Sequence, residues 1–271
     1  MISAALALLA LVPATALRVT VLGGNGYVGQ RVCEKLVERG CDVTSISKSG
    51  KAPSGAWTQQ VKWVANDLTR GSRQELEAAV GAPDVAVSCV GTVGFDGRGL
   101  ELGNGVANVR AAEALKGVTR FVLVSVASEV AAAKGWLPGY FEFYFKGKAM
   151  AEAAATEAAG EGNAYVVKPS FIYGGDSFEL FPPRVASGYG AAIEEILSNA
   201  IITKIADVLP GLLKVALRPP SSVDAVAEAC VRCAVGDCAT TVLDGTVAIN
   251  DAAGADKATG FSDFVGGLST N

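Results

Sequence analysis

The stretch "VTVLGGNGYVGQRVCEKL", residues 19–36, joins a short apolar run to a helical pattern through a glycine-rich turn. The run before the glycines is apolar and rich in β-branched residues, which predicts a buried strand over 18–22. Apolar residues recur at helical spacing after the turn, which predicts a helix over 27–39. A glycine turn between a strand and a helix is the context in which such a turn binds a dinucleotide.

Two glycine patterns fit this turn. Gly24, Gly26 and Gly29 match G-x-G-x-x-G, and Gly23, Gly26 and Gly29 match G-x-x-G-x-x-G. Glycines permit the tight turn, the approach of a pyrophosphate to the backbone and the packing of helix on strand. The helix N-terminus favours negative charge. Glycine-rich turns without a ligand are also common. We predict dinucleotide binding by Gly23, Gly24, Asn25, Gly26, Tyr27, Val28 and Gly29.

The composition excludes several classes of function. The chain has 271 residues, half of them hydrophobic, which is enough to bury a large core. Its formal net charge of -4 and the absence of a basic stripe argue against nucleic-acid binding. It contains no histidine, so Ser-His-Asp catalysis, Cys-His catalysis and histidine-ligated metal sites are excluded.

Apolar runs alternate with helical patterns along the first 168 residues. Strands are predicted at 18–22, 42–46, 61–65, 84–90, 120–126 and 164–168, and helices at 27–39, 72–80, 103–116 and 140–159. This alternation predicts an α/β fold, a doubly wound parallel sheet of Rossmann type. The more helical, proline-punctuated part that follows predicts a small C-terminal lobe at about 174–241, within one domain of residues 17–271.

The N-terminus and the cysteines give further expectations. Residues 1–16 form an apolar leader that ends in Ala14-Thr15-Ala16, a pattern typical of a secretory-type signal; an uncleaved apolar N-terminus is the alternative. Cys230 and Cys233 form a single C-x-x-C, so no metal site is predicted. The six cysteines are interpreted as thiols of the core.

The end of the second strand, "DVTSISKSGKAP", lacks the carboxylate that would bind the ribose hydroxyls of NAD. Ser47 and Lys48 stand there instead, and hydroxyl and ammonium groups suit the 2′-phosphate of NADP; the alternative is that the lysines are solvated loop charges. Asp67 follows the third strand, where it either bonds the adenine amino group or caps the next helix. Gly91 follows the fourth strand, where the backbone would pass close to the adenosine.

Tyr144 and Lys148, in "YFEFYFKGKAMAEAA", lie four residues apart and therefore on one face of a helix. An ammonium group beside a phenol lowers its pKa, which suits a tyrosine for acid-base catalysis. Tyr-x-x-x-Lys is common by chance, but here it follows a glycine fingerprint and a strand that ends near Ser125. Tyr144, Lys148 and Ser125 are therefore the candidate catalytic residues.

With these motifs, residues from about Leu17 to Val226 resemble the atypical branch of the short-chain dehydrogenase/reductase superfamily. Within that branch the chain is similar to an accessory subunit of respiratory complex I, a yeast coenzyme Q assembly protein and plastid relatives. The resemblance implies that Gly23, Gly26 and Gly29 hold the pyrophosphate of NADP or NAD and that Tyr144 and Lys148 form the active-site pair. It also implies a mitochondrial or plastid location.

The chain departs from the superfamily where the catalytic hydroxyl is expected. In "LVSVASE" this position falls on Val126, with Ser125 one residue early and Ser128 two residues late. We therefore favour an NAD(P)(H)-binding protein with weak or lost catalysis, an accessory or assembly factor of a membrane complex. The alternative is an active NADPH-dependent reductase of a carbonyl, quinone or lipid-like substrate.

An apolar helical stripe between Ala192 and Leu217 includes Ile196, Ile201, Ile205 and Val208. Such stripes usually close a core, and we favour that interpretation. A lipid or quinone site, or a membrane-facing surface, is the alternative.

Overall fold

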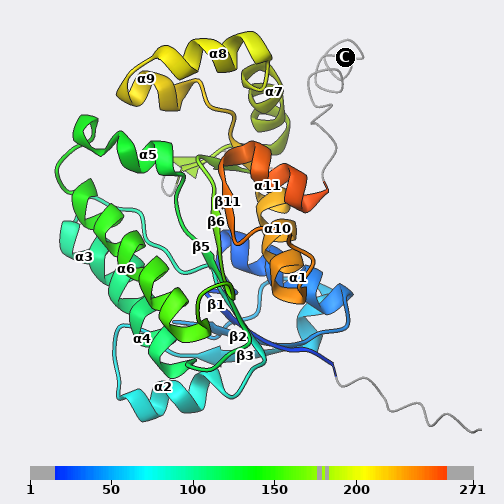
Figure 1. Cartoon of the computed structure of the whole chain (residues 1–271). Helices are drawn as coiled ribbons and strands as arrows, with labels where there is room; N and C mark the ends of the chain where they lie inside the picture. Colours follow the sequence, from blue (N-terminus) through cyan, green and yellow to red (C-terminus); the bar gives the residue numbers. More distant parts are fainter. Residues whose placement is uncertain (1–15, 176–178, 181–182, 255–271) are drawn as a thin grey trace, which may run out of the picture.

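A parallel sheet of seven strands lies at the centre of the computed structural model, which describes residues 16–175, 179–180 and 183–254 (Figure 1). The strand order is β11-β6-β5-β4-β1-β2-β3. The strands are β1 (Arg18–Leu22), β2 (Asp42–Ser47), β3 (Val61–Ala65), β4 (Val85–Ser88), β5 (Arg120–Val124), β6 (Ala164–Lys168) and β11 (Val242–Asp244). The predicted α/β fold with a parallel Rossmann-type sheet is confirmed. The edge strand β11 was not predicted.

Helices cover both faces of this sheet (Figure 1). Helices α1 (Tyr27–Glu38), α10 (Val223–Val235) and α11 (Gly245–Ala253) enclose one hydrophobic cluster with the sheet. Helices α2 (Arg73–Val80), α4 (Ala107–Ala114) and α6 (Phe141–Ala159) enclose the other. The inner strands are buried on both faces, which explains why they read as continuous apolar runs.

The helix predicted over 103–116 starts earlier than expected. Asp96 caps α3 (Gly97–Glu101) by accepting hydrogen bonds from the backbone N–H groups of Arg98 and Gly99. A π-helical turn at Leu102–Val106 then joins α3 to α4. The glycines of this segment hid its helical character in the sequence, because glycine is a poor helix former.

Three helices lie beyond the carboxyl edge of β5 and β6: α7 (Ser187–Leu197), α8 (Ala200–Val208) and α9 (Gly211–Ala216) (Figure 1). The remaining short elements are α5 (Ser128–Ala132), the turns at Ala56–Gln60 and Lys134–Trp136, and the strand pairs β7 (Ile172–Tyr173) with β10 (Ser221–Ser222) and β8 (Glu179–Leu180) with β9 (Pro183–Arg184).

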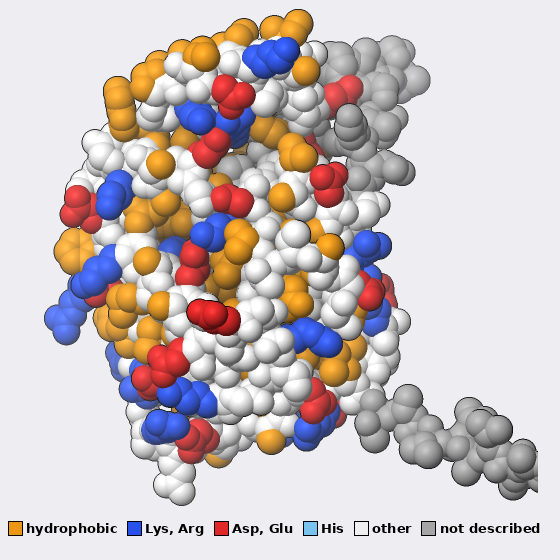
Figure 2. All heavy atoms as spheres, viewed as in Figure 1, with side chains coloured by type: hydrophobic (Ala, Val, Ile, Leu, Met, Phe, Trp, Pro, Cys, Tyr) orange, Lys and Arg blue, Asp and Glu red, His pale blue; other side chains and the backbone are white. Residues whose placement is uncertain are grey.

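The expectation that the apolar stripe between Ala192 and Leu217 closes the core is wrong. Asn199 caps α8 and Pro210 precedes α9, so the stripe is divided among three helices that change direction. Ala192 and Ala206 are buried, whereas Ile201 is 69% and Val208 81% exposed. Figure 2 shows hydrophobic side chains along the edge formed by α8 and α9, where Ile201, Ile205, Val208 and Leu213 are exposed; Ile196 of α7 is exposed as well.

The interpretation of all cysteines as core thiols also needs correction. Cys33 and Cys230 are free and buried, as expected. Cys233 instead forms a disulfide with Cys238, because α10 ends at Val235 and the chain turns back over its last turn. The C-x-x-C pair is therefore divided between a free thiol and a disulfide.

The predicted leader lies outside the described residues, apart from Ala16. Within the part of the chain that the structure describes, no helix has the length and hydrophobicity needed to cross a membrane.

Candidate functional site

The glycine turn after β1 brings backbone into contact with backbone. Gly23 has a φ of 78° and accepts a 2.8 Å hydrogen bond from the N–H of Gly26. A Cβ atom on Gly29 would lie 2.2 Å from the carbonyl oxygen of Gly23. A Cβ atom on Gly24 would lie 2.2 Å from Oγ of Ser45 on β2. Only glycine fits these positions without a rearrangement.

Gly26 is the N-cap of α1, and no side chain caps this helix. The first backbone N–H groups of an α-helix have no partner within the helix, so they are available to an anion. The turn fits the pyrophosphate of a dinucleotide, because it combines closely packed glycines with a helix N-terminus free of side-chain caps.

A cavity of about 340 Å³ opens beside this turn. Six of the predicted cofactor residues line it together: Gly23, Gly26, Ser47, Lys48, Asp67 and Gly91. They come from the carboxyl ends of four neighbouring strands, β1 to β4, which meet at one edge of the sheet. Asn25 is not among the lining residues; its Nδ2 donates a hydrogen bond to Oγ of Ser49 over 3.2 Å.

The end of β2 presents hydroxyl and ammonium groups to the cavity. Lys48 is exposed, and its Nζ lies 3.8 Å from a carboxylate oxygen of Asp67. Oγ of Ser47 accepts a hydrogen bond from the N–H of Gly50, which holds the turn after β2. Asp67 does not cap a helix, because α2 is capped by Ser72; it accepts two hydrogen bonds from Thr69, which lower the pKa of its carboxyl group.

Two buried asparagines, which the sequence analysis missed, hold the loop after β4. Asn104 is fully buried, accepts from the N–H of Thr92 and donates to the carbonyl oxygens of Thr92 and Leu100. Asn108, one turn later, donates to the carbonyl oxygens of Val90 and Asn104. Their spacing of four residues on an otherwise apolar helix face is the signal that was available in the sequence.

Tyr144 and Lys148 lie together on α6, with Nζ of Lys148 5.8 Å from the centre of the Tyr144 ring. Lys148 is 6% exposed and donates a 3.0 Å hydrogen bond to the carbonyl oxygen of Val124, at the end of β5. A Cβ atom on Gly91 would lie 3.4 Å from this Nζ. Because Gly91 lines the cavity next to the glycine turn, the ammonium group of Lys148 lies beside that cavity.

The expectation that Lys148 lowers the pKa of Tyr144 is wrong for this structure. Burial raises the pKa of Tyr144 to about 12, because the ionised phenol loses its hydration. Burial also lowers the pKa of Lys148 to about 8, and the nearby Glu152 partly opposes that shift. Near pH 7 Tyr144 is a neutral hydroxyl that can donate a proton, and Lys148 remains mainly charged.

The hydroxyl of Ser125 is already engaged. It donates a 2.5 Å hydrogen bond to Oε1 of Glu152, whose Oε2 lies 2.8 Å from Nζ of Lys168. Val126 is 8% exposed, and Ser128 is an exposed residue at the start of α5. The structure brings Tyr144 and Lys148 together, and it places the hydroxyl of Ser125 in a hydrogen bond with α6.

The model of the NAD dependent epimerase/dehydratase family matches residues 19–232, which include the glycine turn, Tyr144 and Lys148. The chain belongs to this family. Family membership implies a dinucleotide cofactor of the NAD or NADP type, in agreement with the cavity beside the glycine turn.

Two curated proteins are similar to parts of the chain. An uncharacterized chloroplastic protein of Arabidopsis thaliana, At1g32220, is 37% identical over 162 residues, which cover 58% of this chain and 51% of that protein. MIOREX complex component 2 of Saccharomyces cerevisiae is 42% identical over 57 residues, 19% of this chain and 21% of that protein. The matches thus span about half and about a fifth of these relatives.

Solved structures share the fold at low sequence identity. Thermoplasma acidophilum aldohexose dehydrogenase has a TM-score of 0.55 at 14% identity, with 85% of this chain and 92% of that chain covered. Bordetella bronchiseptica WbmH, solved in complex with NAD+, has a TM-score of 0.53 at 17% identity, with 81% and 72% covered. These likenesses support the fold of the family.

Proposed function

We propose that the protein binds NADP(H) and catalyses carbonyl reduction slowly. The observation that supports NADP(H) binding is the cavity lined together by Gly23, Gly26, Ser47, Lys48 and Gly91. Titration of the purified chain with NADPH and NADH, followed by nucleotide fluorescence, tests it. Failure to bind either nucleotide, or a clear preference for NADH, contradicts the proposal.

Lys48 is proposed to select NADPH through the 2′-phosphate. Lys48 lines the cavity, and among the residues that the structure describes its ammonium group has only the 3.8 Å contact to Asp67, so it is available to a second anion. Lys48→Glu should weaken NADPH binding by about tenfold or more, since charge-assisted contacts to phosphate are among the stronger hydrogen bonds. NADH binding should change little.

Lys62→Glu is the matched control, because Lys62 is an exposed lysine on β3 outside the cavity lining. Equal losses in the two variants would indicate a general effect of charge and would contradict a specific contact from Lys48.

In the proposed reaction the bound dinucleotide and the side chains of the protein have separate roles. The nicotinamide of NADPH supplies the hydride. Tyr144, held neutral by burial, donates the proton to the carbonyl oxygen, and Lys148 binds the ribose hydroxyls and contributes positive charge beside the phenol. Ser125 would orient the substrate only after release from Glu152, which supports a slow reaction.

Val126→Ser should accelerate the reaction. The substitution places a hydroxyl two residues beyond the end of β5, and the loss of one such donor typically costs about 10²- to 10³-fold in rate. We expect turnover of ketones and quinones with NADPH to rise by at least about tenfold. An unchanged rate, with a wild-type enzyme that is already fast, would contradict the proposed weak catalysis.

A second candidate function, that of an accessory or assembly factor, is favoured by the exposed apolar side chains of α8 and α9. The yeast relative is named as a component of a complex, which supports the same proposal. Bound NADPH would then stabilise a fold recognised by a membrane complex in a mitochondrion or plastid, with a quinone or lipid as a further ligand. Native mass measurement of protein isolated from its source would detect nucleotide, lipid and partner.

A further inference from the structure

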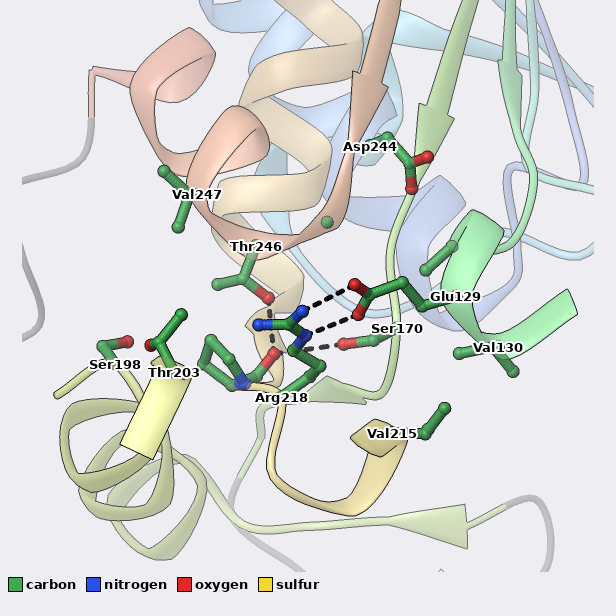
Figure 3. Close-up of a pocket in the computed structure, with 13 residues that line it drawn as sticks. Glu129, Val130, Ser170, Ser198, Thr203, Val215, Arg218, Asp244, Thr246 and Val247 are labelled. Atoms are coloured by element: carbon green, nitrogen blue, oxygen red, sulfur yellow. Dashed lines mark hydrogen bonds and ion pairs between the residues drawn. The ribbon is translucent and has the colours of Figure 1, made fainter. Parts of the chain in front are cut away.

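A second cavity, of about 310 Å³, lies between the sheet and helices α8 and α9 (Figure 3). We call it the lobe pocket; its lining includes Glu129, Val130, Thr203, Val215, Arg218 and Thr246. No described residue lines both the lobe pocket and the cavity beside the glycine turn. Its volume is at the lower end of the range for small-molecule sites, about 300–1,000 Å³.

Arg218 is the central charged group of the lobe pocket, and carboxylates already compensate its charge. Its Nε lies 2.5 Å and its Nη2 2.6 Å from the two carboxylate oxygens of Glu129 (Figure 3). Nη2 also lies 2.7 Å from Oδ1 of Asp207. These contacts raise the pKa of Arg218 and lower that of Glu129, so both remain ionised.

Three of the four side-chain hydroxyl groups that line the lobe pocket are also engaged; among the described residues, the hydroxyl of Ser198 has no protein partner. Thr246 and Ser170 donate to the carbonyl oxygen of Pro219 over 2.6 and 3.1 Å, and Thr203 donates to the carbonyl oxygen of Asn199 over 3.1 Å. Bonds made by protein groups to each other leave fewer donors for a ligand.

Nη1 of Arg218 is a charged donor that is likewise left for a ligand. Among the described residues it donates no hydrogen bond to a protein atom, and Figure 3 shows this edge of the guanidinium facing away from Glu129, towards Thr203 and Thr246. The rest of the wall is largely apolar, with Val130, Val215 and Pro219.

We propose that the lobe pocket binds a compact, uncharged and mainly apolar molecule whose oxygen accepts a hydrogen bond from Nη1 of Arg218. An anion is disfavoured, because the three carboxylates of Glu129, Asp207 and Asp244 outnumber the two cations, Arg218 and Lys214, that Glu129 and Asp207 pair with. A cation would have to compete with Arg218 for Glu129. The volume of the lobe pocket is large enough for a small ring. Its balance of charges favours a neutral ligand over a charged one of the same shape.

Benzamide, benzoate and benzamidine test this proposal, because they share one shape and are neutral, anionic and cationic. The isotope-labelled full chain, with and without NADP+, is titrated with each probe at millimolar concentration and followed by backbone amide shifts. We expect benzamide to shift Val215, Arg218 and Thr246 and to bind at least about tenfold more tightly than the other two. The result should not depend on NADP+, so a failure to bind the dinucleotide would leave it unaffected.

Three variants locate the binding in the lobe pocket. Val215→Phe fills the lobe pocket and should abolish benzamide binding, whereas Leu213→Phe adds the same ring to an exposed position of α9 and should leave it unchanged. Arg218→Lys keeps the charge but removes Nη1, and should weaken benzamide about tenfold. Tighter binding of benzoate or benzamidine, equal binding by Val215→Phe, or no binding by any probe would overturn the proposal.

Discussion

Gly29→Ala should weaken NADPH binding by at least about 100-fold, since the glycine turn can no longer close around the phosphates. The new Cβ would lie 2.2 Å from the carbonyl oxygen of Gly23 and 2.8 Å from Cα of Gly24. Both are backbone atoms, so the overlap must move α1 away from the turn. The shift would also disturb the hydrogen bond from Gly26 to Gly23.

Alanine variants of other glycines, in which the added Cβ overlaps less or not at all, separate this effect from a general loss of folding. A Cβ on Gly26 would lie 3.1 Å from the oxygen of Gly23, so Gly26→Ala should have a smaller effect. Gly135→Ala is the control, because no atom lies within 4 Å of the added Cβ. Nucleotide fluorescence gives the affinity, and circular dichroism shows whether each variant is folded. A folded Gly29→Ala protein with unchanged affinity would refute the glycine turn as the phosphate site.

Tyr144→Phe should lower NADPH-dependent carbonyl reduction by about 10²-fold or more, the usual range for a general acid. NADPH affinity should be unchanged, because the substitution removes only the hydroxyl. The ring remains packed edge-to-face against Phe141 and Phe145, so the fold should be retained. Steady-state rates with a panel of ketones and quinones measure the effect.

Tyr140→Phe provides the matched control one helical turn earlier, where the ring stacks on Phe141. Turnover that survives in Tyr144→Phe would exclude Tyr144 as the proton donor. A wild-type protein without turnover would instead favour the accessory role, in which Tyr144→Phe is silent and Gly29→Ala removes both cofactor and partner.

Much of the fold follows from local patterns in the sequence. The six predicted strands all occur, and the inner strands β1, β4 and β5 are short apolar runs buried on both faces of the sheet. The glycine turn was predictable because the spacing of its glycines and the strand and helix on either side of it all indicate a dinucleotide-binding turn. Edge strand β11 has only three residues, too few to give a periodic signal.

The residues of the candidate site could be predicted from the sequence, but their hydrogen-bond partners and burial could not. Gly23, Ser47, Asp67 and Gly91 meet in one cavity because parallel strands end at one edge. The engagement of Ser125 by Glu152 depends on α6 crossing β5, which no local pattern reveals.

The sequence by itself determined the order of the first six strands, the glycine turn between β1 and α1, and the Tyr144–Lys148 spacing, because these depend on neighbours within a few residues. Only the tertiary structure decided that burial raises the pKa of Tyr144, that α8 exposes Ile201 and Ile205, and that Arg218 meets Glu129 from 89 residues away. Burial and charge compensation are properties of what surrounds a side chain in space. Residues distant in the chain set both.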